Sequence, residues 1–191
     1  MFRAIALAAL GWSALTASAV AQNTAEWSQV GGWKIRVDRT IGNGCFAYQT
    51  YDDGSVIRLG FNPETKTIYF VLGNDAWQSL EVGKKYRITF EFDGVDRYDG
   101  ELMGTTIGDG KTVFLNHNNV SVQFTQAFMQ RNAMRVYYRG SRIASLSLAN
   151  TYAAIGEVLK CQGEVNRSNG GQNVSDPFRS GGGNSNDPFR R

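Results

Sequence analysis

The sequence predicts an α+β fold that is mainly antiparallel β: a curved sheet or partly open barrel with two short helices, one disulfide and a disordered C-terminal tail. Three observations support this prediction. Short runs in which apolar and polar residues alternate fill most of the chain, and this period of two is typical of half-buried strands. Helical spacing appears only late, after a series of strands, which favours an α+β arrangement. Two cysteines, Cys45 and Cys161, lie near the two ends of the patterned region.

The first part of the patterned region is expected to consist of strands joined by tight turns. Asp53-Gly54 lies between two β-prone runs, at a position typical of hairpin turns, and a second hairpin is expected to turn at residues 108–110. Residues 73–85 are expected to form a short helical connection. The segments that predict strands are WKIRVD (33–38), CFAYQTYDDGSVIRLGF (45–61), TIYFVL (67–72), YRITFEF (86–92) and GELMGTTIGDGKTVFL (100–115).

Two helices are expected late in the chain. Two phenylalanines four residues apart in VQFTQAFMQRN (122–132) lie on one face of a helix. A hairpin is expected in residues 134–148. The final helix is expected to begin at Asn150 or Thr151, either of which is a suitable N-cap, and to end at Cys161.

The chain divides into three segments. Residues 1–21 combine a short basic start, an apolar run and a final Ala-Val-Ala, which predicts a removable export signal rather than an uncleaved anchor. Residues 22–161 are expected to form one β-rich domain. Residues 162–191 are dominated by Gly, Ser and Asn, and such a segment buries too little apolar surface to offset its ordering entropy. We therefore expect a periplasmic or secreted protein without a transmembrane segment in its mature chain.

Composition limits the chemistry that the chain can support. The formal net charge is only +3 and falls by one when Arg3 is removed with the export signal, which argues against nucleic acid as a partner. Two cysteines and one histidine are too few for a zinc or iron–sulfur centre, and we expect no metal and no cofactor. In an oxidising compartment an isolated pair of cysteines predicts a disulfide, here between Cys45 and Cys161.

Candidate catalytic groups are sparse. The one histidine, His117, lies in the polar segment LNHNNVS without a nucleophile motif, and we interpret it as a solvated loop residue. Asp93, Asp96, Asp99 and Glu101 lie close together, but their spacing is not that of a calcium loop, and we interpret them as turn residues. We therefore expect that the protein is not an enzyme.

The densest basic cluster of the sequence surrounds residues 131–142. Arg135 and Arg139 are expected on one face of a strand with Tyr137 between them. Such a pair is suited to an anionic envelope component, which makes it a candidate interaction site. The same pattern is typical of a solvated sheet face whose charges discourage edge pairing, and this is the interpretation that we favour.

Three segments together carry a resemblance: GGWKIRV (31–37), GCFAYQTY (44–51) and SRIASLSLANTYAAIGEVLKC (141–161). They resemble exported alphaproteobacterial envelope proteins, including those related to the invasion-associated locus B family. The resemblance covers about residues 27–161 and includes no catalytic signature. It implies a β-rich protein of the periplasm or outer envelope, with no enzymatic residues to carry over.

The C-terminal tail contains the tetrapeptide DPFR twice, eleven positions apart. In these repeats Phe178 and Phe189 are candidate apolar anchors, and Arg179 and Arg190 are candidate charged contacts. Two copies on one tether raise the apparent affinity for a multivalent partner through effective concentration. A neutral duplication within low-complexity sequence is the alternative.

These observations predict an exported non-catalytic envelope protein whose partner is an envelope protein or a surface polymer. One alternative is an inhibitor of a periplasmic or foreign hydrolase, because small β domains clamped by a disulfide suit such blocking roles. The other alternative is a hydrolase that cleaves an envelope glycan or peptide through carboxylates in its turns.

Overall fold

The computed structural model describes residues 23–107, 110 and 112–170 of the chain. Within these residues the chain forms ten strands, two α-helices and a short 3-10 helix, η1. In chain order they are β1 (Thr24–Val30), β2 (Trp33–Asp38), η1 (Arg39–Ile41), β3 (Gly44–Thr50), β4 (Ser55–Asn62), β5 (Thr67–Asn74), β6 (Lys85–Phe92), β7 (Asp96–Thr106), β8 (Val113–His117), α1 (Val122–Gln130), β9 (Ala133–Tyr138), β10 (Ser141–Ser147) and α2 (Thr151–Gly170).

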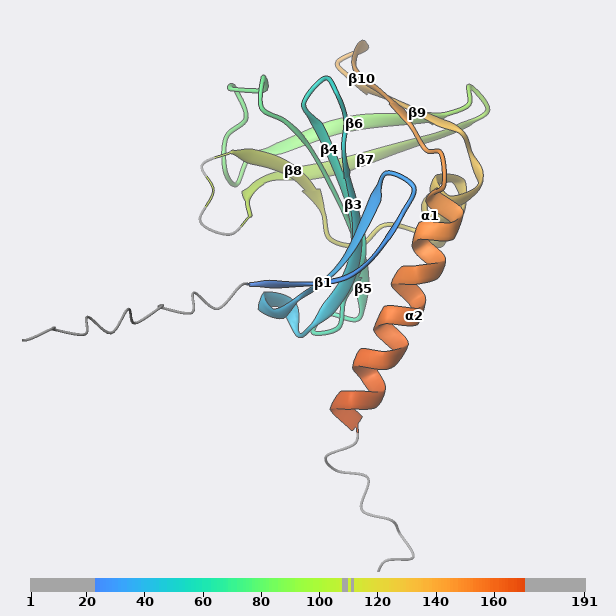
Figure 1. Cartoon of the computed structure of the whole chain (residues 1–191). Helices are drawn as coiled ribbons and strands as arrows, with labels where there is room; N and C mark the ends of the chain where they lie inside the picture. Colours follow the sequence, from blue (N-terminus) through green and yellow to red (C-terminus); the bar gives the residue numbers. More distant parts are fainter. Residues whose placement is uncertain (1–22, 108–109, 111, 171–191) are drawn as a thin grey trace, which may run out of the picture.

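All these strands belong to one antiparallel sheet in the order β1-β2-β3-β4-β5-β8-β7-β6-β9-β10. The edge strands β1 and β10 do not pair with each other, so the sheet is open rather than a closed barrel. Figure 1 shows β6 and β7 crossing the direction of β3, β4 and β5, which means that the sheet bends over its own inner face. The predicted fold class is therefore confirmed.

The main core fills the space between the two crossing halves of the sheet. Phe70 of β5 and Phe90 of β6 have ring centroids 5.5 Å apart, although β8 and β7 lie between these strands in the sheet order. Phe124 of α1 contacts both rings, at 5.3 Å and 5.2 Å. Edge-to-face contacts of this kind are favourable beyond the area they bury. Helix α1, predicted from its phenylalanine spacing, is therefore confirmed and helps to fill this core.

The predicted disulfide between Cys45 of β3 and Cys161 of α2 is present, with the two Cα atoms 6.0 Å apart. Helix α2 lies along β1, β2 and β3 (Figure 1). Next to the disulfide, Gln162 Oε1 accepts a hydrogen bond from the Cys45 backbone N–H at 2.8 Å. Both contacts fasten the last helix to an early strand.

Helix α2 is longer than predicted. It begins at Thr151, as expected, but continues past Cys161 to Gly170, so the predicted end is wrong and residues 162–170 are helical rather than part of a disordered tail. Val165 packs against the main core, and this tertiary contact stabilises the additional helical turns. The composition of the segment does not reveal such a contact. The predicted tail residues 171–191 and the predicted export signal, residues 1–21, lie outside the described residues.

The connection between β5 and β6 also differs from the prediction. Residues 75–84 form successive turns instead of a short helix. Asn74 Oδ1 accepts a hydrogen bond from the Ala76 N–H at 2.8 Å, which turns the chain directly after β5. Trp77 of this connection is partly buried and packs against the main core. Neither α1 nor α2, the helices of the described part, is both long and apolar enough to cross a membrane.

Candidate functional site on the outer face of the sheet

A second, smaller apolar cluster lies on the outer face of the sheet. Because successive side chains of a strand point to opposite faces, Cys45 and Ala47 of β3 enter the main core, whereas Phe46 and Tyr48 point outward. We call the outward set the outer cluster. Its buried members and the partly buried residues packed against them are Phe46, Tyr69, Val71, Ile41, Tyr48, Ile107 and Phe114.

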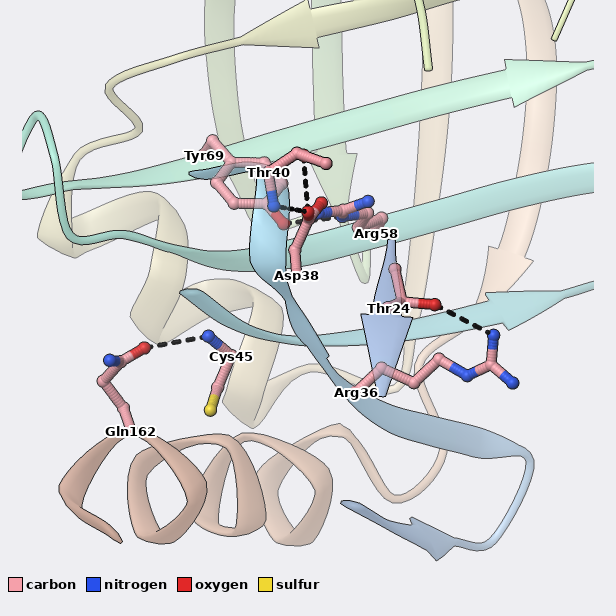
Figure 2. Close-up of polar contacts among 8 residues, drawn as sticks. All are labelled: Thr24, Arg36, Asp38, Thr40, Cys45, Arg58, Tyr69 and Gln162. Carbon is pink, nitrogen blue, oxygen red and sulfur yellow. Dashed lines mark hydrogen bonds and ion pairs between the residues drawn. The ribbon is translucent and has the colours of Figure 1, made fainter. Parts of the chain in front are cut away.

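Arg58 of β4 lies within the outer cluster and is only 9% exposed. Its Nη2 is 2.5 Å from Oδ2 of Asp38, at the end of β2, and its Nε donates to the Tyr69 hydroxyl at 2.5 Å. Its guanidinium carbon lies 3.6 Å from the centre of the Phe46 ring, a cation–π contact. Figure 2 shows this group on the side of the strands away from α2, whereas Cys45 points toward the helix. The pairing compensates a charge that burial would otherwise make costly.

The protonation states of this group follow from its contacts. Burial raises the pKa of the Asp38 carboxyl, but hydrogen bonds from Arg58 and Thr40 outweigh it, and the net pKa lies below the ordinary value. Thr40 donates to Asp38 Oδ1 from its N–H at 2.8 Å and from its hydroxyl at 2.6 Å. Burial raises the pKa of Tyr69 well above its ordinary value, and Arg58 opposes this rise only in part. At neutral pH Asp38 is therefore ionised and Tyr69 keeps its proton.

Gly60 allows the backbone of β3 at Phe46 to lie close against β4. A Cβ at position 60 would lie 2.4 Å from the Phe46 Cβ and 2.8 Å from the Cys45 carbonyl oxygen, which is too close for any side chain. Glycine in a strand interior often marks such a close approach. In the sequence "RLGF" the arginine therefore lies two positions before the glycine that admits Phe46, on the same face of β4.

A hollow of about 200 Å³ opens beside Arg58, and we call it the outer hollow. It is lined by Arg58, Tyr69 and Val71 from the sheet, by Ile41 of η1, by Ile107 beyond β7 and by Asn116 of β8. These residues are far apart in the sequence and meet because β8 inserts beside β5 in the sheet order. The site is therefore a product of the topology rather than of one local motif.

A pair of cations extends the outer cluster toward β2. The Lys34 Nζ lies 5.9 Å and the Arg36 guanidinium 5.8 Å from the centre of the Tyr48 ring. Arg36 also forms an ion pair with Glu26 and donates to the Thr24 hydroxyl at 3.4 Å, the second contact being drawn in Figure 2. Aromatic rings and arginines are enriched at recognition surfaces.

The structure separates the two arginines of the predicted basic pair. Arg135 lies in β9 and forms an ion pair with Glu91 of β6 at 3.0 Å. Arg139 follows the end of β9 with a φ of 49° and stacks over the Tyr138 ring at 5.1 Å. Because the turn begins at Arg139, the two side chains occupy different environments. The other predicted interaction residues, Phe178, Arg179, Phe189 and Arg190, lie outside the described residues.

His117 ends β8 and is half-buried, so its interpretation as a solvated loop residue is wrong. It lines a cavity of about 160 Å³ together with Asp99 and Ser121, and burial lowers its pKa. The Ser121 hydroxyl accepts a hydrogen bond from the Phe124 N–H at 3.1 Å as the cap of α1, and Asp99 accepts one from the Thr89 hydroxyl. Among the described residues no hydrogen bond joins His117 to either Ser121 or Asp99.

The four carboxylates of residues 93–101 make separate contacts. Asp93 lies in the β6–β7 turn and accepts hydrogen bonds from backbone N–H groups of Asn132 and Ala133, so its turn interpretation is confirmed. For the other three this interpretation is wrong, because β7 begins earlier than expected. Their partners are Arg131 for Asp96, Thr89 for Asp99 and Lys85 for Glu101.

Arg58 was not among the residues predicted to form a site, although the sequence contains a signal for it. Arg58 interrupts the apolar strand segment SVIRLGF, and a charge in such a strand requires a partner when it is buried. Its partner Asp38 lies twenty positions earlier, at the end of a different strand. Only the pairing of β2 with β3 and of β3 with β4 brings the two residues together.

Comparison of the sequence with known protein families and with curated proteins finds no match. The fold is similar to the crystal structure of invasion-associated protein B from Bartonella henselae, with a TM-score of 0.51 and 10% sequence identity. The matched region covers 71% of this chain and 97% of that protein. At this identity the likeness concerns the fold alone, and the resemblance expected from the sequence is confirmed at that level.

Proposed function

We propose that the protein is an exported, non-catalytic protein of the cell envelope, periplasmic or secreted, that binds a protein or a surface polymer. The outer cluster is the observation that carries this proposal. It combines a buried ion pair, aromatic rings and a hollow on a sheet face whose opposite side is already occupied by the main core. A concave site with a few convergent polar groups is the usual form of a binding site.

Export is supported by two independent features. Residues 1–21 carry the pattern of a cleavable signal, and the Cys45–Cys161 disulfide belongs to the class of bonds that persist in oxidising compartments. The fold similarity to an invasion-associated protein is in keeping with a role outside the cytoplasm.

Hydrolysis of an envelope glycan or peptide is a second candidate, favoured by the cavity that His117 shares with Asp99 and Ser121. In this arrangement the Ser121 hydroxyl caps a helix instead of contacting the histidine. A nucleophile requires a base within hydrogen-bond reach, and this geometry therefore favours binding over catalysis.

Binding can be tested with the exported, disulfide-bonded chain immobilised and exposed to purified peptidoglycan, lipopolysaccharide, capsular polysaccharide and defined envelope proteins. Tyr48→Ala removes the ring between Lys34 and Arg36, and Tyr137→Ala on β9 is its matched control. We expect one ligand to be retained by the natural chain and by Tyr137→Ala, to be lost by Tyr48→Ala, and to be recovered chemically unchanged.

Equal retention by both variants, or retention of no ligand by the natural chain, contradicts the proposed function. A shortened polymer supports the hydrolase candidate, and Ser121→Ala then shows whether the cavity at His117 is responsible. A retained ligand that is itself a hydrolase, with reduced activity, supports the narrower role of an inhibitor.

A further inference from the structure

Polar groups around the outer hollow have unused hydrogen-bonding capacity within the described part of the chain. The Tyr69 hydroxyl accepts a hydrogen bond from Arg58 but donates its own proton to no acceptor. The Asn62 Oδ1 accepts from two backbone N–H groups, at 3.0 Å and 3.2 Å, and its amide N–H groups have no acceptor. The hollow therefore offers more than one hydrogen-bond donor to a ligand.

The Asn116–Asn118 pair leaves further donors free. The Asn116 Nδ2 donates to Asn118 Oδ1 at 2.8 Å. The Asn116 Oδ1 has no partner among the described residues, but it is shielded from solvent and lies beyond the reach of a ligand in the hollow. The Asn118 amide N–H groups donate to no acceptor within the described part and remain available to a ligand.

The hollow offers no excess charge to an ion. The charges of Arg58 and Asp38 neutralise each other at 2.5 Å, and the Phe46 ring covers the guanidinium. Tyr69 keeps its proton because burial raises its pKa. A carboxylate or phosphate would have to compete with Asp38 for Arg58, so the site favours an uncharged ligand.

The size and the apolar walls restrict the ligand further. A volume of about 200 Å³ is below the range of roughly 300–1,000 Å³ typical of sites for drug-sized molecules. Val71, Ile41 and Ile107 provide apolar surface beside the polar groups. A ring with C–H faces and several hydroxyl or amide groups fits both properties.

We propose that the outer hollow binds a single uncharged sugar unit, the terminal or branching residue of a surface polymer. This inference rests on the proposed function and specifies its ligand. Tyr69, Asn62 and Asn118 supply donors to the sugar hydroxyls, and Ile41 and Ile107 cover the C–H faces of the ring. The surface formed by Tyr48, Lys34 and Arg36 contacts the neighbouring part of the polymer.

Nuclear magnetic resonance of the uniformly 15N-labelled, disulfide-bonded chain tests the inference. Methyl N-acetylglucosaminide and methyl galactoside serve as neutral probes, and glucuronate serves as the charged counterpart. They are added to about 20 mM, well above an expected Kd on the order of 1 mM. At least one neutral sugar is expected to shift the side-chain amide signals of Asn62, Asn116 and Asn118.

Two variants locate the binding. Asn118→Ala removes an exposed amide of the hollow. It is expected to raise the Kd for the neutral sugar by about fivefold to tenfold, the effect of one lost hydrogen bond. Asn119→Ala changes the exposed neighbour that lines the His117 cavity instead, and it is expected to leave the Kd unchanged. Unchanged thermal unfolding midpoints in both variants show that the fold is retained.

The inference is overturned if no neutral sugar shifts these signals, if glucuronate binds as tightly as the neutral sugars, or if the two variants weaken binding equally. Displacement of a bound sugar by short peptides at equal concentration also overturns it. Loss of polymer retention in Tyr48→Ala without any sugar signal in the hollow leaves the proposed function standing and rejects only this inference.

Discussion

The outer faces of the two halves of the sheet accommodate charge in opposite ways. On the β2–β5 half, the side chains of Arg58 and Asp38 are only 10% and 8% exposed and share their contacts with an aromatic ring and a hydroxyl. On the β6–β9 half, Arg135 and Glu91 are 40% and 23% exposed. In this protein the arginine within an apolar strand is buried with several partners, whereas an arginine from the basic cluster of the sequence forms a more exposed ion pair.

The largest expected difference between the halves is in stability. Arg58→Ala leaves Asp38 buried without its cation and should lower the free energy of unfolding by about 3–5 kcal/mol. Arg135→Ala breaks a surface pair and should cost no more than about 1 kcal/mol. Urea denaturation of both variants at neutral pH measures the difference. Equal losses would show that the buried pair has no special role in the outer cluster.

The disulfide ties α2 to the β2–β5 half alone. Replacing both Cys45 and Cys161 with Ala should lower the free energy of unfolding by about 2–4 kcal/mol, the typical contribution of such a bond. Hydrogen exchange should quicken first in α2 and β3, while β6, β7 and β9 keep their protection. Uniform loss of protection across the sheet would argue that the two halves unfold as one unit.

Acid should remove the contribution of the buried pair to stability only at low pH. Because the pKa of Asp38 is lowered in the folded state, its stabilising contribution is complete above the unfolded-state pKa of about 3.9. That contribution is lost as the pH falls through the folded pKa. Urea midpoints measured from neutral pH downward should therefore decline at acid pH, and less steeply in Asp38→Asn. Parallel curves would assign the decline to other carboxylates.

The smallest expected effect concerns salt and the exposed pairs. Lys85→Gln removes the contact with Glu101 on β7, and any loss of stability should disappear when high salt screens exposed charges. The coupling between Asp38 and Arg58 in a double-mutant cycle should persist at the same salt concentration. If salt reduces the stabilising contribution of both pairs to the same degree, the difference in burial has no energetic consequence and the comparison between the halves fails.

The sequence was sufficient to predict the strands other than β1, both helices and the disulfide, because period-two and helical patterns report burial directly. The sequence pattern did not predict the length of α2. Residues 162–170 are polar and contain glycine, and their helix depends on the contact of Val165 with the core and on the bond from Gln162 to β3. Composition alone does not report such tertiary contacts.

The candidate site was less predictable than the fold. Arg58, Asp38 and Asn116 belong to three strands. The pairing of β2, β3 and β4 joins the first two, and Asn116 joins them because β8 lies beside β5, which no local pattern specifies. Arg135 and Arg139 attracted attention because they are close in sequence, yet a left-handed residue at the strand end separates them. Proximity in the sequence therefore did not place the two arginines in one environment.

Site-specific photo-crosslinking in the native cell tests the central claim most directly, that the outer face of the β2–β5 half is the binding surface. A photoreactive residue at position 107 lies beside the outer hollow, and one at position 95 lies in the exposed β6–β7 turn. The account predicts a discrete adduct with a protein or polymer from position 107 and none from position 95. An adduct from position 95 alone, or from neither position, would contradict it.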